Sequence, residues 1–331
     1  MADATVAFVP RETVSRTIDS LNSILLHTAT PYELIIVIAC YPETLRAKLR
    51  NIARERGATC VELEGYVTPN EARNAALARV RTSYVAFIDN DAEVRGDWLG
   101  PLIACARTHK AAIVAPMVFE LYPPFTRIHM AGGEARLVRP RNGTVSMSEL
   151  HYHAHNDIAG LSFPEAFETE LVEFHAVLVE SDWLRSTGGL DPELCSMSEH
   201  WDMCLQARMA GRKVMLEPAS EVNYSPPRKV TAEDLRFYDV RWSREWFVRG
   251  ARRLREKYHM RRGAAFRGWR WVVDHRSHAD AQRVRAHLPW LSYRAAQALT
   301  MRIVIPWMET FQSAQFRADL AEWRRNRLHR R

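Results

Sequence analysis

Short apolar runs alternate with segments of helical spacing over the first 117 residues, and this alternation restricts the fold more than any other feature. The segments between the runs place apolar side chains three or four residues apart, as amphipathic helices do. Strands that alternate with helices form a mostly parallel sheet covered by helices on both faces. We therefore predict an α/β fold. The runs are Thr5–Val9, Leu34–Ile38, Cys60–Leu63, Tyr84–Ile88 and Ala112–Met117.

Regular patterning is interrupted over residues 118–172, which are rich in proline, glycine and polar residues. Long irregular segments in compact domains often carry function, and we expect this one to do so. Patterning returns at Glu173–Val179. Beyond it, Ser198 is predicted to cap a helix that ends at Gly211, and Lys213–Leu216 to form a last short strand.

Charge is distributed unevenly along the chain. Residues 246–331 hold 20 Lys and Arg against 6 Asp and Glu, a net charge of +14; the whole chain carries +7, so residues 1–245 carry −7. We predict a domain over residues 1–245, with halves at about 1–117 and 118–245, and a basic helical extension over residues 246–331.

The extension also holds six of the ten tryptophans. Cationic helices that carry Trp suit an anionic membrane surface, and they can equally pack on the core or on a second copy of the chain. No nucleic acid is expected, because the rest of the chain is acidic and no nucleic-acid motif is present. The five cysteines form no CxxC pair, and no signal peptide or long apolar run is seen. We predict a cytoplasmic protein, with peripheral contact at the inner face of a membrane as an option.

Two carboxylates, Asp89 and Asp91, follow the run Tyr84–Ile88 with only Asn90 between them. Ligands bind at the carboxyl ends of strands in open α/β sheets. Paired carboxylates there suit Mg²⁺ or Mn²⁺ shared with a diphosphate. The alternative is a solvated turn in which Asp91 caps a helix.

A helix is predicted to open at Pro69–Asn74, just upstream of this strand. Its free N–H groups can meet phosphate or ribose oxygens, and Arg73 adds a planar donor fork. Asn70 is the predicted cap.

The Arg73-Asn74 helix, the strand and the D-x-D together resemble the donor site of family 2 glycosyltransferases with the GT-A fold. The resemblance covers about residues 1–245, because a turn at Gly188–Asp191 and a helix beginning Glu199-His200-Trp201-Asp202 follow in the family's order. It implies a GT-A-like sheet and a nucleotide-diphosphate sugar as donor. The implied acceptor is a hydroxyl of a glycan, a lipid-linked molecule or a small molecule, and transfer would proceed with inversion by single displacement.

The resemblance also implies the site residues. In the family the second acid usually binds the metal and the first touches the ribose or the sugar, so both Asp89 and Asp91 are metal candidates. The implied donor-binding residues are Pro10, Arg11, Glu12, Asn70, Arg73, Asn74, Asp89, Asn90, Asp91 and His175.

The general base is left open among Glu199, His200 and Asp202. Family members have an aspartate where this chain has His200, and a neutral imidazole can accept a proton near pH 7.

Two departures from the family pattern keep other functions open. The second strand ends in Ile38–Pro42 without the acid that contacts the nucleotide base, and Tyr224 stands near the place of a late histidine. The alternatives are a retaining GT-A enzyme and a non-catalytic sugar-nucleotide or partner-binding protein, and either could be a homo-oligomer. His151, His153 and His155 alternate, so a metal site on one strand face is conceivable, but acceptor-loop or surface histidines are the favoured interpretation.

Overall fold

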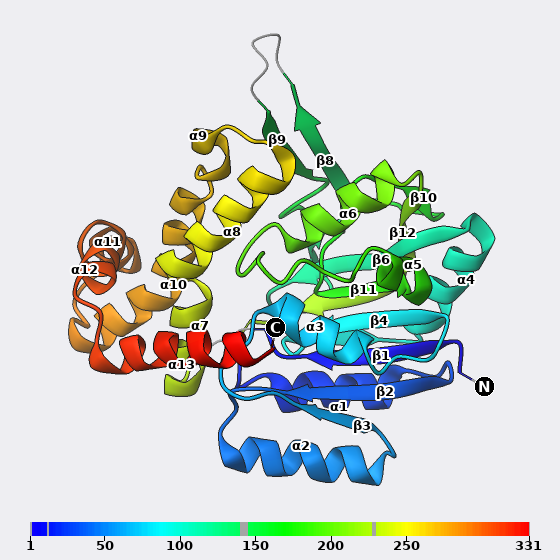
Figure 1. Cartoon of the computed structure of the whole chain (residues 1–331), viewed down its shortest axis with the longest axis horizontal. Coiled ribbons are helices and arrows are strands. Elements are labelled where there is room, and N and C mark those ends of the chain that lie inside the picture. Colours follow the sequence, from blue (N-terminus) through cyan, green and yellow to red (C-terminus); the bar gives the residue numbers. More distant parts are fainter. Residues whose placement is uncertain (1, 12, 140–144, 227–229, 331) are drawn as a thin grey trace.

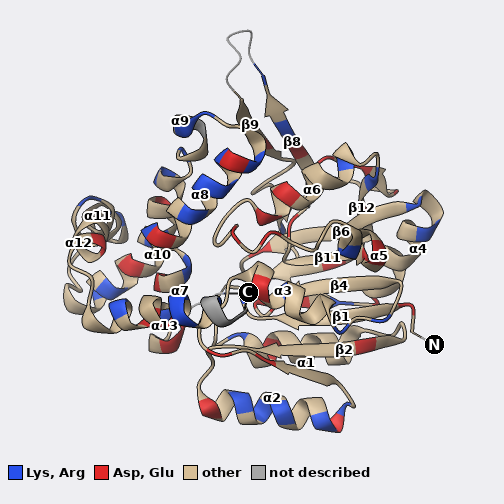
Figure 2. Cartoon of the chain, viewed as in Figure 1, with Lys and Arg blue, Asp and Glu red and all other residues tan. Residues whose placement is uncertain are grey.

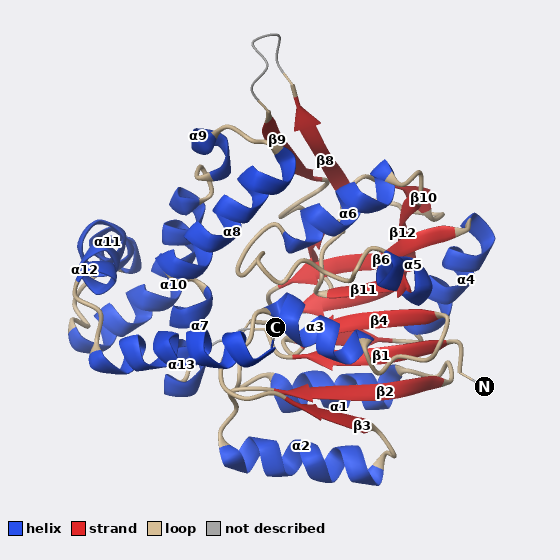
Figure 3. Cartoon of the chain, in the orientation of Figure 1, coloured by secondary structure: helices blue, strands red, loops and turns tan. Residues whose placement is uncertain are grey.

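The computed structural model describes residues 2–11, 13–139, 145–226 and 230–330. One large sheet runs through the molecule in the order β10-β12-β6-β11-β4-β1-β2-β3, with β5 and β7 paired beside β12 and β6 (Figures 1 and 3). The strands are β1 Ala4–Val9, β2 Tyr32–Ile38, β3 Thr59–Glu62, β4 Tyr84–Asp89, β5 Ala92–Arg95, β6 Ala111–Glu120, β7 Arg127–Met130, β8 Gly133–Val138, β9 Ser146–His151, β10 Phe167–Glu168, β11 Ala176–Glu180 and β12 Lys213–Tyr224.

Helices cover both faces of this sheet and form a separate group at one side of it (Figure 3). Those of the first 226 residues are α1 Thr17–His27, α2 Glu43–Glu55, α3 Pro69–Leu77, α4 Leu99–His109, α5 Ser181–Ser186 and α6 Glu199–Met209. The later helices are α7 Ala232–Arg241, α8 Arg244–Tyr258, α9 Arg262–Ala265, α10 Trp269–His287, α11 Tyr293–Leu299, the π-helix η1 Thr300–Val304, α12 Ile305–Thr310 and α13 Ala314–Arg330.

The centre of the sheet is parallel, as the sequence predicts. Strand β1 pairs in parallel with both β2 and β4, and β2 pairs in parallel with β3. Strand β11 is antiparallel to its neighbours β4 and β6. Four of the five apolar runs are buried on both faces, which is why they do not alternate with polar residues; the fifth, Cys60–Leu63, overlaps the partly exposed edge strand β3. The predicted α/β fold with a mostly parallel sheet is confirmed.

Residues 118–172 contain more regular structure than the sequence predicts. They include β7 and the two-stranded sheet of β8 and β9. The last strand is also longer than predicted, because β12 continues to Tyr224 after a register shift between Glu217 and Glu221. Pro218 lies in that shift, where no ladder hydrogen bond is required from it.

Of two predicted helix caps, Asn70 is wrong, and Ser198 is right in position but makes no side-chain capping bond. Helix α3 is capped by Thr68, whose hydroxyl accepts from the Glu71 backbone N–H while the Glu71 carboxylate accepts from the Thr68 N–H. This reciprocal pair satisfies two free donors, so Asn70 is left for other contacts. Ser198 precedes α6 as predicted, but its φ of 65° lies in the left-handed region and its side chain makes no capping bond.

The group of helices from α7 to α13 packs against the sheet domain through ion pairs. Arg249 pairs with Glu193, and Arg253 with Asp191. Arg327 of α13 lies 2.8 Å from the carboxylate of Glu71 in α3. In Figure 1 the C-terminal end of α13 lies beside α3. The basic residues of these helices, visible in Figure 2, are thus partly neutralised by acids of the domain. No helix in the described part of the chain combines the length and the apolar character needed to cross a bilayer.

Candidate active site

A cavity of about 990 Å³ lies between the sheet domain and the late helices. The domain contributes Arg11, Arg73 and Asp89 to its wall, and α8 and α10 contribute Phe247 and Trp271. The sequence predicted these helices as an appendage. The sequence did not predict that these helices line the cavity, because only tertiary packing brings them close to the end of β4.

Asp89 is held between two guanidinium groups at the end of β4. Arg73 Nη2 lies 2.8 Å from Asp89 Oδ1, and Arg11 Nε lies 3.4 Å from Oδ2. Asp89 and Arg73 are both fully buried, and the Arg73 guanidinium lies 3.8 Å from the centre of the Phe174 ring. A buried carboxylate is costly unless it is paired, and the two arginines provide that pairing for Asp89.

Asp91 lies deeper than Asp89 and does not line the cavity. Its Oδ2 accepts a hydrogen bond of 2.9 Å from the Thr13 hydroxyl. Ligand atoms of Asp89, Asp91 and His175 nevertheless lie within 4.8 Å of one another. Two carboxylates and an imidazole suit a divalent cation such as Mn²⁺, so these residues fit the expected metal. Asn90 bonds the backbone N–H of Arg11 at 2.9 Å and thereby fixes that side of the site.

Asn70 and Asn74 act away from the cavity, on the glycine turn that precedes α6. Asn70 donates to the Asp191 carbonyl at 2.9 Å, and Asn74 bonds both the carbonyl and the N–H of Leu190. Gly189 has φ +84°, and a Cβ there would lie 2.8 Å from Asn74 Oδ1, so the turn needs glycine. The two asparagines therefore position α6. Pro10 is buried at the end of β1, and Glu12 lies outside the described residues.

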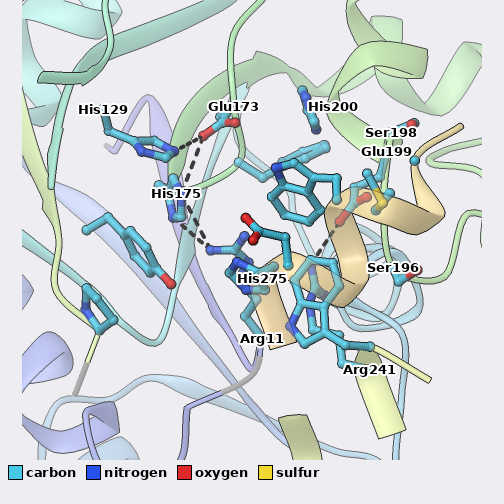
Figure 4. A pocket seen from close by; sticks show the side chains of 18 of the residues that line it. Arg11, His129, Glu173, His175, Ser196, Ser198, Glu199, His200, Arg241 and His275 are labelled. Atoms are coloured by element: carbon cyan, nitrogen blue, oxygen red, sulfur yellow. Dashed lines mark hydrogen bonds and ion pairs between the residues drawn. The ribbon is translucent and has the colours of Figure 1, made fainter. Parts of the chain in front are cut away.

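His175 belongs to a chain of contacts that ends on Arg11 (Figure 4). His129 Nε2 and His175 Nε2 lie 2.8 and 3.4 Å from the same oxygen of Glu173, and Arg11 lies 3.0 Å from His175 Nδ1. Burial and the neighbouring Arg11 hold the pKa of His175 well below its usual range, so it is neutral at pH 7. Sequence reasoning missed His129 and Glu173, for which the only signal is the spacing Glu173-Phe174-His175.

The three base candidates occupy different environments. Both oxygens of Asp202 accept hydrogen bonds: Oδ1 from the Tyr258 hydroxyl at 2.5 Å and Oδ2 from Lys257 Nζ at 2.8 Å. His200 Nε2 lies 3.3 Å from Glu149 Oε1. Burial alone lowers the pKa of His200, but the Glu149 carboxylate outweighs it and raises the pKa to about 9. His200 is therefore a cation at pH 7, which removes its capacity to accept a proton.

Glu199 is the candidate best placed to accept a proton. It lines the cavity, and Arg241 Nη2 lies 3.3 Å from its Oε1 (Figure 4). Its other oxygen, Oε2, is buried and has no hydrogen-bond partner among the described residues. Burial raises the pKa of Glu199, but Arg241 and Arg73 outweigh this and lower it overall, so the carboxylate is ionised at neutral pH.

The three alternating histidines do not share a face. The chain leaves β9 at His151 and turns, with positive φ at His153 and His155. His153 packs edge-on against Phe163 at 5.4 Å between ring centres, and His155 bonds Glu120 at 2.7 Å. His151 and His155 both line the cavity, but of the three only His151 contacts His200. The three-histidine strand face is therefore wrong, because strand alternation ends at His151.

Comparison with known proteins supports a transferase domain. Residues 5–162 match the family described as Glycosyl transferase family 2. Two curated relatives, both named Pre-mycofactocin glycosyltransferase and from Mycobacterium tuberculosis strains CDC 1551 and H37Rv, are 28% identical over 157 residues. That match covers 46% of this chain and spans only 29% of the length of those relatives.

The fold is shared with a solved glycosyltransferase. The crystal structure of GalNAc-T7 with UDP, GalNAc and Mn²⁺ superposes with a TM-score of 0.54 at 15% identity, covering 95% of this chain and 58% of that one. The GT-A-like fold predicted from the motifs is confirmed. The motif variant Glu199-His200-Trp201-Asp202 lies beyond the matched residues 5–162 and stays a prediction.

Proposed function

We propose that the protein uses residues 5–162, which match glycosyl transferase family 2, to move a glycosyl group from a nucleoside-diphosphate sugar to a hydroxyl acceptor. The observation that carries this proposal is the position of Asp89 and Asp91. They lie at the carboxyl end of the central strand β4, with Arg73 and Arg11 beside them. Carboxylates and guanidinium groups together can hold a cation and a diphosphate in one place.

The donor would lie against Asp89, Arg73 and Arg11. A divalent cation bound at Asp91, with Asp89 and His175 as further ligands, would neutralise charge on the departing diphosphate. Arg11 and Arg73 can donate to phosphate or ribose oxygens, and Asn90 holds the Arg11 backbone in place. UDP and Mn²⁺, both present in the GalNAc-T7 crystal, are the first ligands to test.

We assign Glu199 the role of general base in an inverting displacement. The acceptor hydroxyl oxygen forms a bond to the anomeric carbon as the bond from that carbon to the diphosphate oxygen breaks. The hydroxyl proton passes to Glu199 Oε2, and the diphosphate leaves with the electron pair. Arg241 keeps Glu199 ionised beforehand and holds its other oxygen.

The acceptor would lie along the wall formed by the late helices. Trp271 is half exposed there and stacks on His275 with 4.8 Å between ring centres and 8° between planes. Trp242 lies 5.4 Å from Trp271. Flat aromatic surfaces beside polar groups suit the mixed surface of a sugar ring, which favours a glycan-containing acceptor.

Calorimetric titration of a nucleoside-diphosphate panel, with and without Mn²⁺, tests the donor site. The wild type should bind one nucleotide in a Mn²⁺-dependent manner, and Asp91→Asn should lose that dependence. Asp97→Asn is the matched control, because Asp97 makes the same kind of contact, with Thr30, on the exposed surface. Binding of no nucleotide in any condition would overturn the assignment of the donor site.

Product analysis separates this function from its two rivals. An inverted anomeric configuration supports the Glu199 mechanism, and a retained one establishes the retaining alternative. Nucleotide binding without transfer or hydrolysis, over a panel of glycan acceptors, would establish the non-catalytic alternative.

We also propose that η1 and α12 contact an anionic membrane surface. Trp307 of α12 and Phe311 at its C-terminal end are 58% and 63% exposed, and Arg302 of η1 is exposed as well. The full chain should cosediment with vesicles that contain anionic lipid and not with neutral vesicles. Trp307→Ala should weaken binding to the anionic vesicles. The control is Leu26→Ala, at an exposed position on α1, which should leave that binding unchanged. Equal binding by Trp307→Ala would contradict the proposal. A homo-oligomer stays a prediction.

A further inference from the structure

A second cluster of metal-ligating side chains lies in the cavity, outside the donor site. Its members are Glu149 and His151 of β9 and His200 of α6. Glu149 and His151 are two residues apart on a strand, so they project to the same face. His200 lies in the first turn of α6, and its ring approaches the Glu149 carboxylate from that helix. All three line the cavity.

The ligand atoms of this cluster converge on one point. Glu149 Oε1 lies 2.8 Å from His151 Nε2 and 3.3 Å from His200 Nε2. A cation with ligands at about 2.0–2.2 Å in tetrahedral geometry places those ligands about 3.4 Å apart. Glu173 Oε1, 3.8 Å from His151 Nε2, offers a further oxygen at the edge of the cluster. The distance between Glu149 Oε1 and His200 Nε2 matches this value, and that between Glu149 Oε1 and His151 Nε2 is shorter, as expected for a hydrogen bond that a bound ion would replace. All three ligand atoms lie within 4.8 Å of one another.

The neighbouring cluster of His129, Glu173 and His175 fits a cation less well. Arg11 Nη1 lies 3.0 Å from His175 Nδ1, so the guanidinium donates to that nitrogen and the proton of His175 resides on Nε2, facing Glu173. A protonated Nε2 cannot bind a metal beside Glu173. The ring nitrogen that keeps its lone pair, Nδ1, faces Asp89 at 3.9 Å instead. No arginine or lysine contact is recorded for Glu149, His151 or His200 in the described part of the chain.

We propose that Glu149, His151 and His200 bind a divalent transition-metal ion of the zinc class, separately from the donor-site cation. Two imidazoles and one carboxylate prefer Zn²⁺ and Co²⁺ over Mg²⁺, whereas the aspartates of the donor site suit Mg²⁺ or Mn²⁺. The side chains of Glu149, His151 and His200 are 27%, 24% and 18% exposed, so an ion there would keep open positions toward the cavity. It would face the acceptor side, one residue from Glu199. This inference does not depend on the transferase activity.

Co²⁺ titration of the full chain tests the site, with Asp91→Asn as background and excess Mg²⁺ present so that the donor carboxylates do not contribute. The titration is run at about pH 8 because the metal must displace a proton from His200, whose pKa is raised to about 9, and a higher pH lowers that cost. We expect one equivalent of Co²⁺ with visible d–d absorption, displaced by Zn²⁺. His151→Ala and Glu149→Gln should each weaken binding by about 100-fold or more.

His153→Ala is the control, because that imidazole lies two residues away and packs on Phe163. Circular dichroism spectra verify that every variant is folded. Absence of stoichiometric Co²⁺ or Zn²⁺ binding, or unchanged binding in His151→Ala, would overturn the proposal and leave a hydrogen-bonded carboxylate–imidazole network. Neither result depends on whether nucleotides bind.

Discussion

Glu199 shows how the environment of a residue, more than its type, selects it for catalysis. Three acidic or basic side chains lie within four positions on α6, and the sequence leaves them equivalent. The structure separates them, because Lys257 and Tyr258 bind the Asp202 carboxylate and the Glu149 carboxylate stabilises the protonated form of His200. Only Glu199 combines a buried oxygen without a hydrogen-bond partner, among the described residues, with a place on the cavity wall.

Replacement of Glu199 tests this selection. We expect Glu199→Gln to lower kcat by about 10²–10⁴-fold, the usual contribution of a general base, with donor binding nearly unchanged. Asp202→Asn should reduce stability, because it breaks the contacts to Lys257 and Tyr258, and should change kcat by less than about tenfold. Steady-state kinetics with the identified donor measure both variants. A larger loss of kcat in Asp202→Asn than in Glu199→Gln would reassign the base.

The sequence predicts the donor side of the site better than the acceptor side. Arg73, Asp89 and Asp91 come from one continuous helix–strand segment, so their proximity follows from local structure. Glu149 and His200 lie 51 positions apart and meet only because the β8–β9 hairpin folds over α6. Single-sequence patterns carry no information on such a contact, which explains why Glu149 and Glu173 were missed.

At the scale of elements, helix α13 is held to the domain by charge as well as by apolar contact. Arg327 of α13 and Arg249 of α8 both pair with Glu193. Burial alone raises the pKa of Glu193, but the two guanidinium groups outweigh it and lower the pKa to about 2 from its ordinary value of 4.5. The predicted difference in charge between the domain and the late helices therefore appears as ion pairs between them, with arginines of the helices and acids of the domain.

This shift predicts a pH dependence of stability. A carboxylate whose pKa is lower in the folded state stabilises the fold above its unfolded pKa. The stabilisation should be present above about pH 4.5 and be lost as the pH falls toward 2. Glu193→Gln should therefore lower the free energy of unfolding by about 1–2 kcal/mol at pH 7, a value discounted for partial exposure, and by less near pH 3. Urea unfolding at both pH values measures the difference.

Glu256→Gln is the control for this experiment, because Glu256 is exposed on the same helix α8. Its effect should stay within about 0.5 kcal/mol at either pH. A Glu193→Gln effect that does not shrink on acidification would show that the ion pairs with Arg249 and Arg327 do not stabilise the fold.

At the scale of the whole molecule, the boundary predicted near residue 245 from charge does not coincide with a break in the core. One apolar cluster joins Tyr66 and Cys195 of the domain to Trp246, Leu320 and Trp323 of the late helices. Trp246 and Trp323 are fully buried, with 5.2 Å between ring centres. Composition detects the change of charge, but only packing shows that the two parts share a core. The division into domains stays a prediction.

A shared core predicts that the domain and the late helices unfold together. Trp246→Ala removes a fully buried indole and should lower the free energy of unfolding by about 3–5 kcal/mol. The control is Trp290→Ala, which alters a side chain that is 76% exposed and should have an effect within about 0.5 kcal/mol.

Hydrogen–deuterium exchange localises the loss of stability in Trp246→Ala. If the unit is cooperative, amides of β1 and β4 should lose protection in Trp246→Ala by the same free energy as those of α8, because neither part remains folded without the other. Faster exchange confined to α7–α13, with β1 and β4 unchanged, would show instead that the late helices are a separate unit that opens over the cavity.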